Sequence, residues 1–61
     1  MKLDEPKIGE LREWVGTERW GTFLVIGIDG VRVDAILNDG RRDGFFKPYL
    51  MRSSRVVSKA G

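Results

Sequence analysis

Side-chain hydroxyls are candidate covalent nucleophiles in this sequence, which contains no cysteine. Histidine, the side chain that most often activates a hydroxyl, is absent from all 61 residues. No Ser-x-x-Lys motif supplies a lysine as the base instead. We therefore predict no catalytic residue among the available hydroxyls, which are Thr17, Thr22, Ser53, Ser54 and Ser58.

Carboxylates and glycines form two weaker patterns. Asp39 and Asp43 lie four residues apart in the segment DGRRDG, which lacks the alternating oxygen ligands and closing Glu of a calcium loop. Asp39 suits a turn, and Asp43 suits the surface of a strand. The glycines of residues 27–30 have GxxG spacing but belong to a hairpin, not to the start of a helix. We expect neither a metal nor a cofactor.

Basic residues accumulate in the second half of the chain. Residues 1–30 carry four basic and six acidic residues, whereas residues 31–61 carry seven basic and three acidic, for a net charge of +2. If neighbouring strands gather the basic side chains, they form a strip that could hold the phosphates of a nucleic acid. The alternative is that a charged content of 33% only keeps a small domain in solution. The predicted strip consists of Arg41, Arg42, Lys47, Arg52 and Arg55.

Aromatic and apolar side chains provide a second candidate surface. Phe45 and Phe46 are adjacent and must point to opposite faces of a strand, but the sequence leaves open which one enters the core. An exposed tryptophan beside the first loop would anchor a protein partner. An apolar patch on the central hairpin would also suit a homodimer. The residues predicted for protein interaction are Trp20, Phe23, Ile36, Phe45 and Tyr49.

These side chains must be positioned by β-strands. The segment GTFLVIGIDGVRVDAIL contains two β-branched, apolar runs around Asp29-Gly30, which predicts a hairpin with a type I′ turn. The expected pairs are Ile28 with Val31, Ile26 with Val33, and Leu24 with Ala35, forming an apolar core face. The opposite, mixed face would carry Phe23, Val25, Gly27, Arg32, Asp34 and Ile36.

The remaining strands are shorter. Residues 11–15 predict the first strand, and residues 41–47 the fourth, after a turn at Asn38–Gly40 that holds two or three residues. Pro48 should end that strand, so that residues 48–50 form one 3₁₀ turn before a closing strand at residues 54–58. Five short strands with tight turns predict an all-β fold, a closed or nearly closed small barrel.

The layout resembles the SH3-like small barrel in the broad sense that includes KOW, Tudor and Hfq-type modules. The resemblance covers residues 8–57 and is carried by the motifs IGELREW, WGTFLVIGIDGVRVDAIL, NDGRRDGFF and KPYL…RVV. Free-standing barrels of this group resemble small accessory proteins of bacteria and phages that often lack a catalytic role. The resemblance therefore implies a binding module, although the fold alone does not identify a partner.

The specialised members of this group are less similar to the chain. It lacks the A-L-Y-D-Y stretch and paired tryptophans of polyproline-binding SH3 domains, and the V-Q-I-Y segment of the plasmid-borne dihydrofolate reductases. A Tudor-type methyl-lysine cage needs three or four convergent aromatic rings. Trp20, Phe23 and Tyr49 are the candidates for such a cage, but the sequence does not show that they cluster.

The longest mostly apolar run, residues 23–28, has six residues, whereas a membrane-spanning helix needs about 20. The N-terminus also lacks the pattern of a secretory signal. We expect a cytoplasmic protein with a flexible arm at residues 1–7 and one barrel domain at residues 8–61. Its expected function is non-catalytic association with nucleic acid or with a protein of the transcription, translation or replication machinery, through the basic strip. The alternative is a protein-interaction module, an accessory factor or inhibitor, that docks through the aromatic patch.

Overall fold

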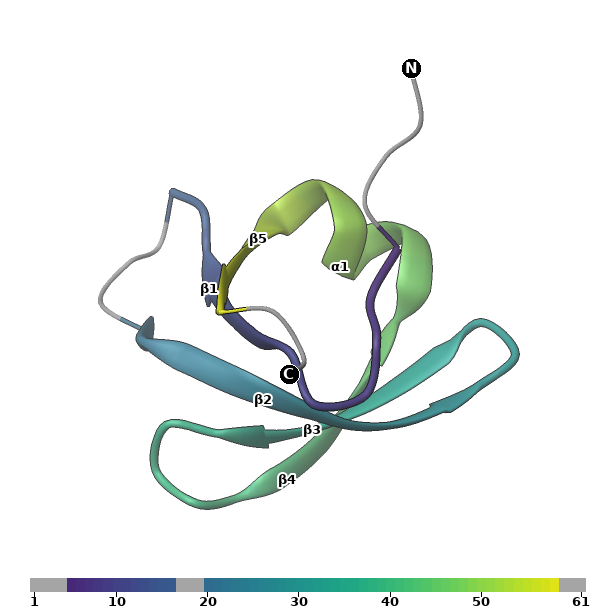
Figure 1. The fold of residues 1–61 in the computed structure, drawn as a ribbon, viewed down its shortest axis with the longest axis horizontal. Helices are drawn as coiled ribbons and strands as arrows, with labels where there is room; N and C mark the ends of the chain where they lie inside the picture. The colour runs from purple at the N-terminus through teal and green to yellow at the C-terminus, as the bar shows by residue number, and fades with distance from the viewer. Residues whose placement is uncertain (1–4, 17–19, 59–61) are drawn as a thin grey trace.

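The computed structural model describes residues 5–16 and 20–58 and forms one antiparallel sheet of five strands (Figure 1). The order of the strands across the sheet is β4-β3-β2-β1-β5. The mostly β class and the five expected strands are thereby confirmed. The elements are β1 (Leu11–Trp14), β2 (Thr22–Asp29), β3 (Arg32–Leu37), β4 (Arg42–Phe46), α1 (Lys47–Ser53) and β5 (Ser54–Ser58).

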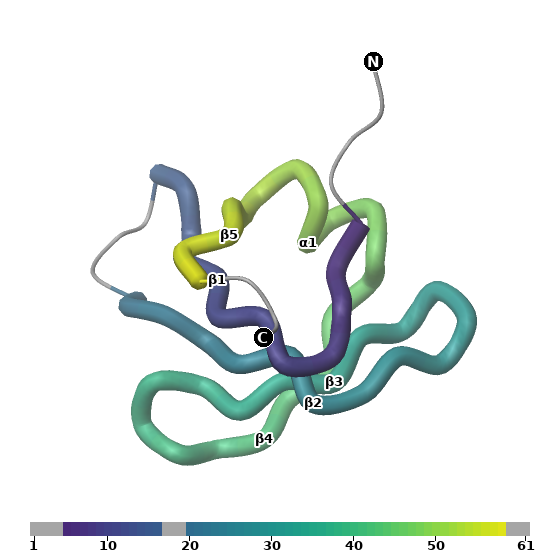
Figure 2. Tube along the Cα trace, viewed as in Figure 1, coloured from purple at the N-terminus to yellow at the C-terminus, as the bar shows by residue number. Residues whose placement is uncertain are grey.

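The sheet is compatible with a small barrel-like fold, but it is not closed. Strands β4 and β5 are its two edges and do not pair with each other in the described chain. Between them the chain forms α1, so that the two edge strands are consecutive along the sequence yet lie at opposite ends of the sheet. Figure 2 shows the same path as a tube, with the β2–β3 and β3–β4 turns at opposite ends of β3.

The central hairpin differs from the predicted register. Asp29 pairs with Arg32, so the two-residue loop is Gly30-Val31 and not Asp29-Gly30. Gly30 has a φ of 60°, and in the described chain all residues with a positive φ are glycines. Glycine at the first central position is typical of a type II′ turn, whereas the predicted type I′ turn needs a positive φ at both positions. The hydrophobic pattern alone did not reveal this shift.

A β-bulge explains which face of the hairpin is buried. The register of β2 against β3 shifts between Val25 and Gly27, which leaves Ile26 as the extra residue. Because of this insertion, residues before and after the bulge both point toward the core, although strict alternation would place them on opposite faces of the sheet. Leu24 and Val31, predicted in the core, are exposed, while the supposedly mixed face provides Phe23 and Val25 to the core. The buried core is Trp14, Phe23, Val25, Val33, Ala35 and Leu50, with Ile28, Leu37 and Phe45 packed against it.

The β3–β4 turn decides the orientation of the adjacent phenylalanines. The Gly40 N–H donates to the carbonyl of Leu37 at 2.9 Å, and the Leu37 N–H donates to the carbonyl of Arg41 at 2.7 Å. The loop therefore holds three residues, with Gly40 at a φ of 89°, which is the turn-plus-bulge form of a three-residue hairpin loop. In this register Phe45 packs against the core, and Phe46 is 62% exposed.

The segment predicted as one 3₁₀ turn is instead the seven-residue helix α1. Pro48 lies in its first turn, where a missing N–H costs no helical hydrogen bond. Leu50 anchors the helix in the core, and the Val15 N–H donates to the Ser53 carbonyl at 2.8 Å. No helix in residues 5–16 and 20–58 has the length and apolar character needed to cross a membrane.

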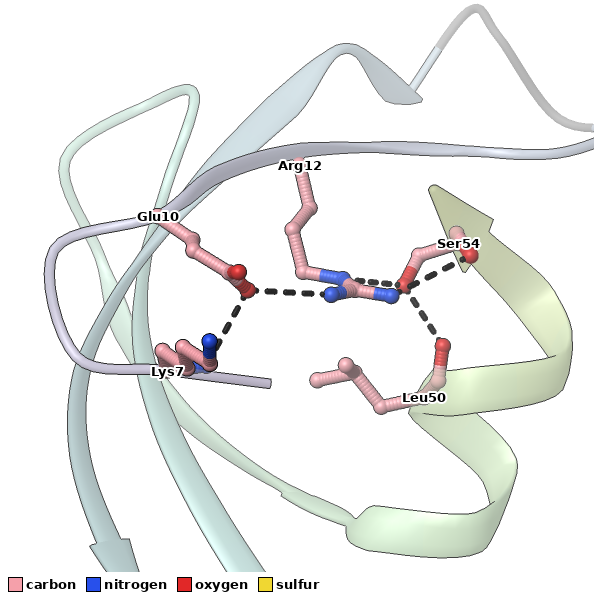
Figure 3. A network of polar contacts seen from close by, with 5 residues as sticks. All are labelled: Lys7, Glu10, Arg12, Leu50 and Ser54. Carbon is pink, nitrogen blue, oxygen red and sulfur yellow. Dashed lines mark hydrogen bonds and ion pairs between the residues drawn. The ribbon is translucent and has the colours of Figure 1, made fainter. Parts of the chain in front are cut away.

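A buried polar network joins β1, β5, α1 and the N-terminal segment (Figure 3). The Arg12 guanidinium is 1% exposed and donates to Glu10 Oε1 at 3.0 Å and to Ser54 Oγ at 2.9 Å. The Ser54 hydroxyl in turn donates to the Leu50 carbonyl at 2.5 Å. The Glu10 carboxylate also accepts the Lys7 N–H at 3.0 Å. A charged pair thus holds the sheet and helix together on the core side of β1.

Part of the predicted N-terminal arm can be described. Residues 1–4 lie outside the described residues, whereas Pro6 is buried and Glu5 forms an ion pair with Lys47 at 3.9 Å. Together with the hydrogen bond of the Lys7 N–H, these contacts place residues 5–7 against the rest of the fold.

Candidate functional site

The predicted basic strip does not form on neighbouring strands. It required β4 and β5 to be adjacent, but they are opposite edges of the sheet. Three of its members also have acidic partners: Arg41 with Asp39 at 2.7 Å, Arg55 with Glu13 at 2.6 Å, and Lys47 with Glu5 at 3.9 Å. Arg42 and Arg52 are exposed at separate places, on β4 and α1. The five basic side chains are therefore spread over the molecule.

Two of the residues predicted for protein interaction, Phe23 and Ile36, do not line the cleft described below. Phe23 is 1% exposed and belongs to the core, because the β-bulge at Ile26 reverses the face expected for the part of β2 that precedes it. Its side chain is therefore not part of the exposed hairpin patch that was expected to meet a partner. Ile36 lies on the opposite, outer face of the sheet, where it pairs with Leu24.

The other three predicted interaction residues, Trp20, Phe45 and Tyr49, line one cleft of about 400 Å³. The cleft lies where the β1–β2 and β3–β4 connections meet the start of α1. Arg41 of the predicted basic strip is also part of its wall. The remaining lining residues, which the sequence did not single out for binding, are Trp14, Leu37, Asn38, Asp39 and Asp43.

Trp14 is the centre of the aromatic wall. Its ring centroid lies 5.1 Å from that of Phe45, 5.9 Å from that of Trp20 and 6.0 Å from that of Tyr49. These are distances of direct contact between rings, with edge-on and tilted geometry. Trp14 itself is buried, whereas Trp20 is 51% exposed and Tyr49 is 41% exposed. The cleft therefore has a fixed aromatic floor and two rings available to a ligand.

The rim formed by the β3–β4 turn is polar. Asp39 accepts the Arg41 backbone N–H at 3.0 Å and the Arg41 Nε–H at 2.7 Å. The backbone hydrogen bond is the main cause of a lowered pKa for Asp39, aided by the side-chain bond and the charge of Arg41, so the carboxylate is ionised at neutral pH. Asp43 accepts the N–H of Gly44 at 2.8 Å. Two carboxylates and one guanidinium thus line the cleft.

Gly21 lies where the β1–β2 loop and the β3–β4 turn come close together. Its φ is 79°, and a Cβ at this position would lie 2.9 Å from Cγ of Asn38. Real Cβ atoms essentially never approach another atom so closely. The absence of a side chain at Gly21 therefore allows Asn38 of the β3–β4 turn to lie close to the start of β2.

We predict that Gly21→Ala lowers the free energy of unfolding more than Gly40→Ala does. Both substitutions place alanine at a positive φ, at a cost of about 1–2 kcal/mol. At Gly40 a Cβ would meet nothing within 4 Å, whereas at Gly21 it meets Asn38. The additional loss at Gly21 should be about 1 kcal/mol, the cost of forcing the exposed Asn38 side chain out of its rotamer. Urea denaturation measures both variants, and Gly21→Ala/Asn38→Gly should recover the difference. Equal losses at Gly21 and Gly40 would contradict the contact.

No group of three or more His, Cys, Asp or Glu side chains that could hold a metal ion occurs among residues 5–16 and 20–58. In comparisons with known proteins, no family model, no curated protein and no solved structure matches this chain. Its function must therefore be inferred from the chemistry of the cleft.

Proposed function

We propose that this protein is a non-catalytic binding module with an SH3-like barrel fold, and that its aromatic cleft binds a short segment of a partner protein. The strand order β5-β1-β2-β3-β4, with a helix between β4 and β5, supports the resemblance to small barrels. The observation that carries the functional proposal is the cleft, in which exposed Trp20 and Tyr49 flank the buried ring of Trp14.

The cleft has the properties of a peptide-binding site. Its volume of about 400 Å³ is in the range of sites that enclose a few side chains. Tryptophan and tyrosine are enriched among the residues that contribute most to protein–protein affinity, because they bury large areas at a small entropic cost. Trp14 fixes both exposed rings through direct ring contacts, so little ordering is needed when a partner binds.

The charges of the cleft favour a protein partner over a nucleic acid. Among the described residues, its lining contains Asp39 and Asp43 but only one basic residue, Arg41, which is already paired with Asp39. A phosphate backbone would be repelled by the two carboxylates and would find no unpaired guanidinium among these lining residues. Nucleic-acid affinity depends mainly on phosphate contacts. The aromatic cleft therefore suits a segment that combines apolar side chains with positive charge.

The test is selection from a displayed peptide library on the immobilised protein, followed by titration of a synthetic selected peptide. Trp20→Ala and Tyr49→Ala should each weaken binding by about tenfold or more, the loss of a typical interaction hot spot. Phe46→Ala is the matched control, because Phe46 is an exposed aromatic residue outside the cleft. Its affinity should stay within about twofold of the unmodified protein.

Two results would overturn the proposal. One is the absence of any peptide whose binding depends on Trp20 and Tyr49. The other is binding of single-stranded RNA or duplex DNA at about 50 mM salt that decreases with increasing salt concentration and is lost in Arg42→Ala/Arg52→Ala. The second result would assign the function to the dispersed basic residues instead of the cleft.

A further inference from the structure

The cleft contains a carboxylate, that of Asp43, without a charged partner among residues 5–16 and 20–58, and this feature points to the chemistry of its ligand. We infer that the cleft binds an arginine side chain of the partner segment, with the guanidinium at the Asp43 carboxylate and its plane on the exposed aromatic rings. This inference rests on the proposed function and specifies which residue of the partner is recognised.

Unlike most acidic residues around the sheet, Asp29 and Asp43 form no ion pair among the described residues, and of these two Asp43 lines the cleft. Glu10, Glu13, Asp34 and Asp39 each form an ion pair with an arginine of the chain. Asp43 has no cationic partner among the described residues, and its Oδ1 accepts only the N–H of its neighbour Gly44. Its other carboxylate oxygen accepts no hydrogen bond from the described residues, and Asp43 and Phe45 both line the cleft. A cation that reaches this position would therefore gain a partner without displacing a cation of the described chain.

The aromatic wall favours a planar cation. The ring of Trp14 contacts those of Trp20 and Tyr49 at centroid distances of 5.9 and 6.0 Å. All three rings line the cleft, and those of Trp20 and Tyr49 are partly exposed. A guanidinium can lie flat on the exposed face of such a ring and still direct its N–H groups at a carboxylate. A methylated lysine that lacks N–H donors could not make the second interaction.

The cleft already holds one guanidinium of the chain itself. Arg41 donates its Nε–H to Asp39 Oδ2 at 2.7 Å on the same rim, although its side chain is 77% exposed. Asp39 and Asp43 are both lining residues of the β3–β4 hairpin. The Arg41–Asp39 pair therefore shows that this rim accommodates a guanidinium beside a carboxylate, and Asp43 offers a second such position.

The experiment is a titration of the ¹⁵N-labelled full chain with Nα-acetyl-arginine amide, followed through the tryptophan indole N–H signals. The chain has two tryptophans, and both line the cleft, so these signals report binding directly. Nα-acetyl-citrulline amide is the neutral probe of the same shape. We expect the arginine probe to bind about fivefold more tightly than the citrulline probe, from one exposed ion pair and one cation–π contact.

Asp43→Asn should remove the preference for arginine over citrulline, because the amide keeps the oxygen that accepts the Gly44 N–H but loses the charge. Asp29→Asn is the control, since Asp29 is exposed at the end of β2 and does not line the cleft. Equal binding of both probes, or tighter binding of Nα-acetyl-trimethyllysine amide, would overturn the inference. If library peptides bind through Trp20 and Tyr49 but do not need arginine, the proposed function stands and only this inference fails. If no peptide and no probe binds, both fail.

Discussion

Arg12→Met should lower the free energy of unfolding by about 3–5 kcal/mol, the loss expected when one partner of a buried ion pair is removed. Arg12 is 1% exposed, and its guanidinium bonds to Glu10 and Ser54. Without it, the Glu10 carboxylate stays buried with the Lys7 N–H as its remaining donor in the described chain. A chain of 61 residues has a total stability of only about 3–9 kcal/mol. The variant should therefore lose at least about a third of its stability.

Urea denaturation followed by tryptophan fluorescence measures this loss. The matched control is Arg42→Met, because Arg42 is exposed and forms no ion pair among the described residues, and its change should stay within about 0.5 kcal/mol. Glu10→Gln/Arg12→Met should recover part of the stability, since it removes the unpaired buried charge. If Arg12→Met and Arg42→Met are equally stable, the buried network does not hold the fold together.

The second large effect is expected at Trp14. Trp14→Ala should cost about 3–5 kcal/mol, as for other large aromatic residues removed from a core. The ring packs on Phe23 at a centroid distance of 4.6 Å and also forms the floor of the cleft, so stability and peptide binding should be lost together. Stability is measured by urea denaturation, and binding by titration with a selected peptide under conditions where the variant is folded.

Trp20→Ala should differ from Trp14→Ala in its effect on stability. Trp20 lines the same cleft but is 51% exposed, so its removal should cost about 1 kcal/mol or less in stability while binding is lost. A Trp14→Ala variant that keeps its stability would show that the ring is not part of the core. A Trp20→Ala variant that loses as much stability as Trp14→Ala would show that the two rings do not have separate roles.

The strands could be predicted because their signals are local. The closing strand was predicted at residues 54–58, as observed, and the first at residues 11–15, one residue longer than β1. The register of the central hairpin could not be predicted in the same way. Phe23 and Val25 follow one alternation and Ile28 the other, and only the bulge at Ile26 lets all three reach the core. A bulge cannot be recognised in the sequence of a strand whose residues are apolar on both faces.

The buried arginine and the cleft depend on tertiary structure. A charged residue in a strand is normally assigned to the solvent side, since burying it without a partner is costly. The available signal was that Glu10, Arg12 and Trp14 lie two residues apart, so a buried Trp14 places the other two on the same face. The cleft combines side chains from β1, β3, β4, α1 and two loops, which no local pattern brings together.

The buried network and the cleft share no residue, and this separation has a consequence for engineering. The network uses Lys7, Glu10, Arg12, Leu50 and Ser54, whereas the polar rim of the cleft comes from the β3–β4 turn. Asn38, Asp39 and Arg41 can thus be randomised without touching the buried network. Because the chain contains no cysteine, libraries built on this turn could be folded and selected inside the reducing interior of living cells.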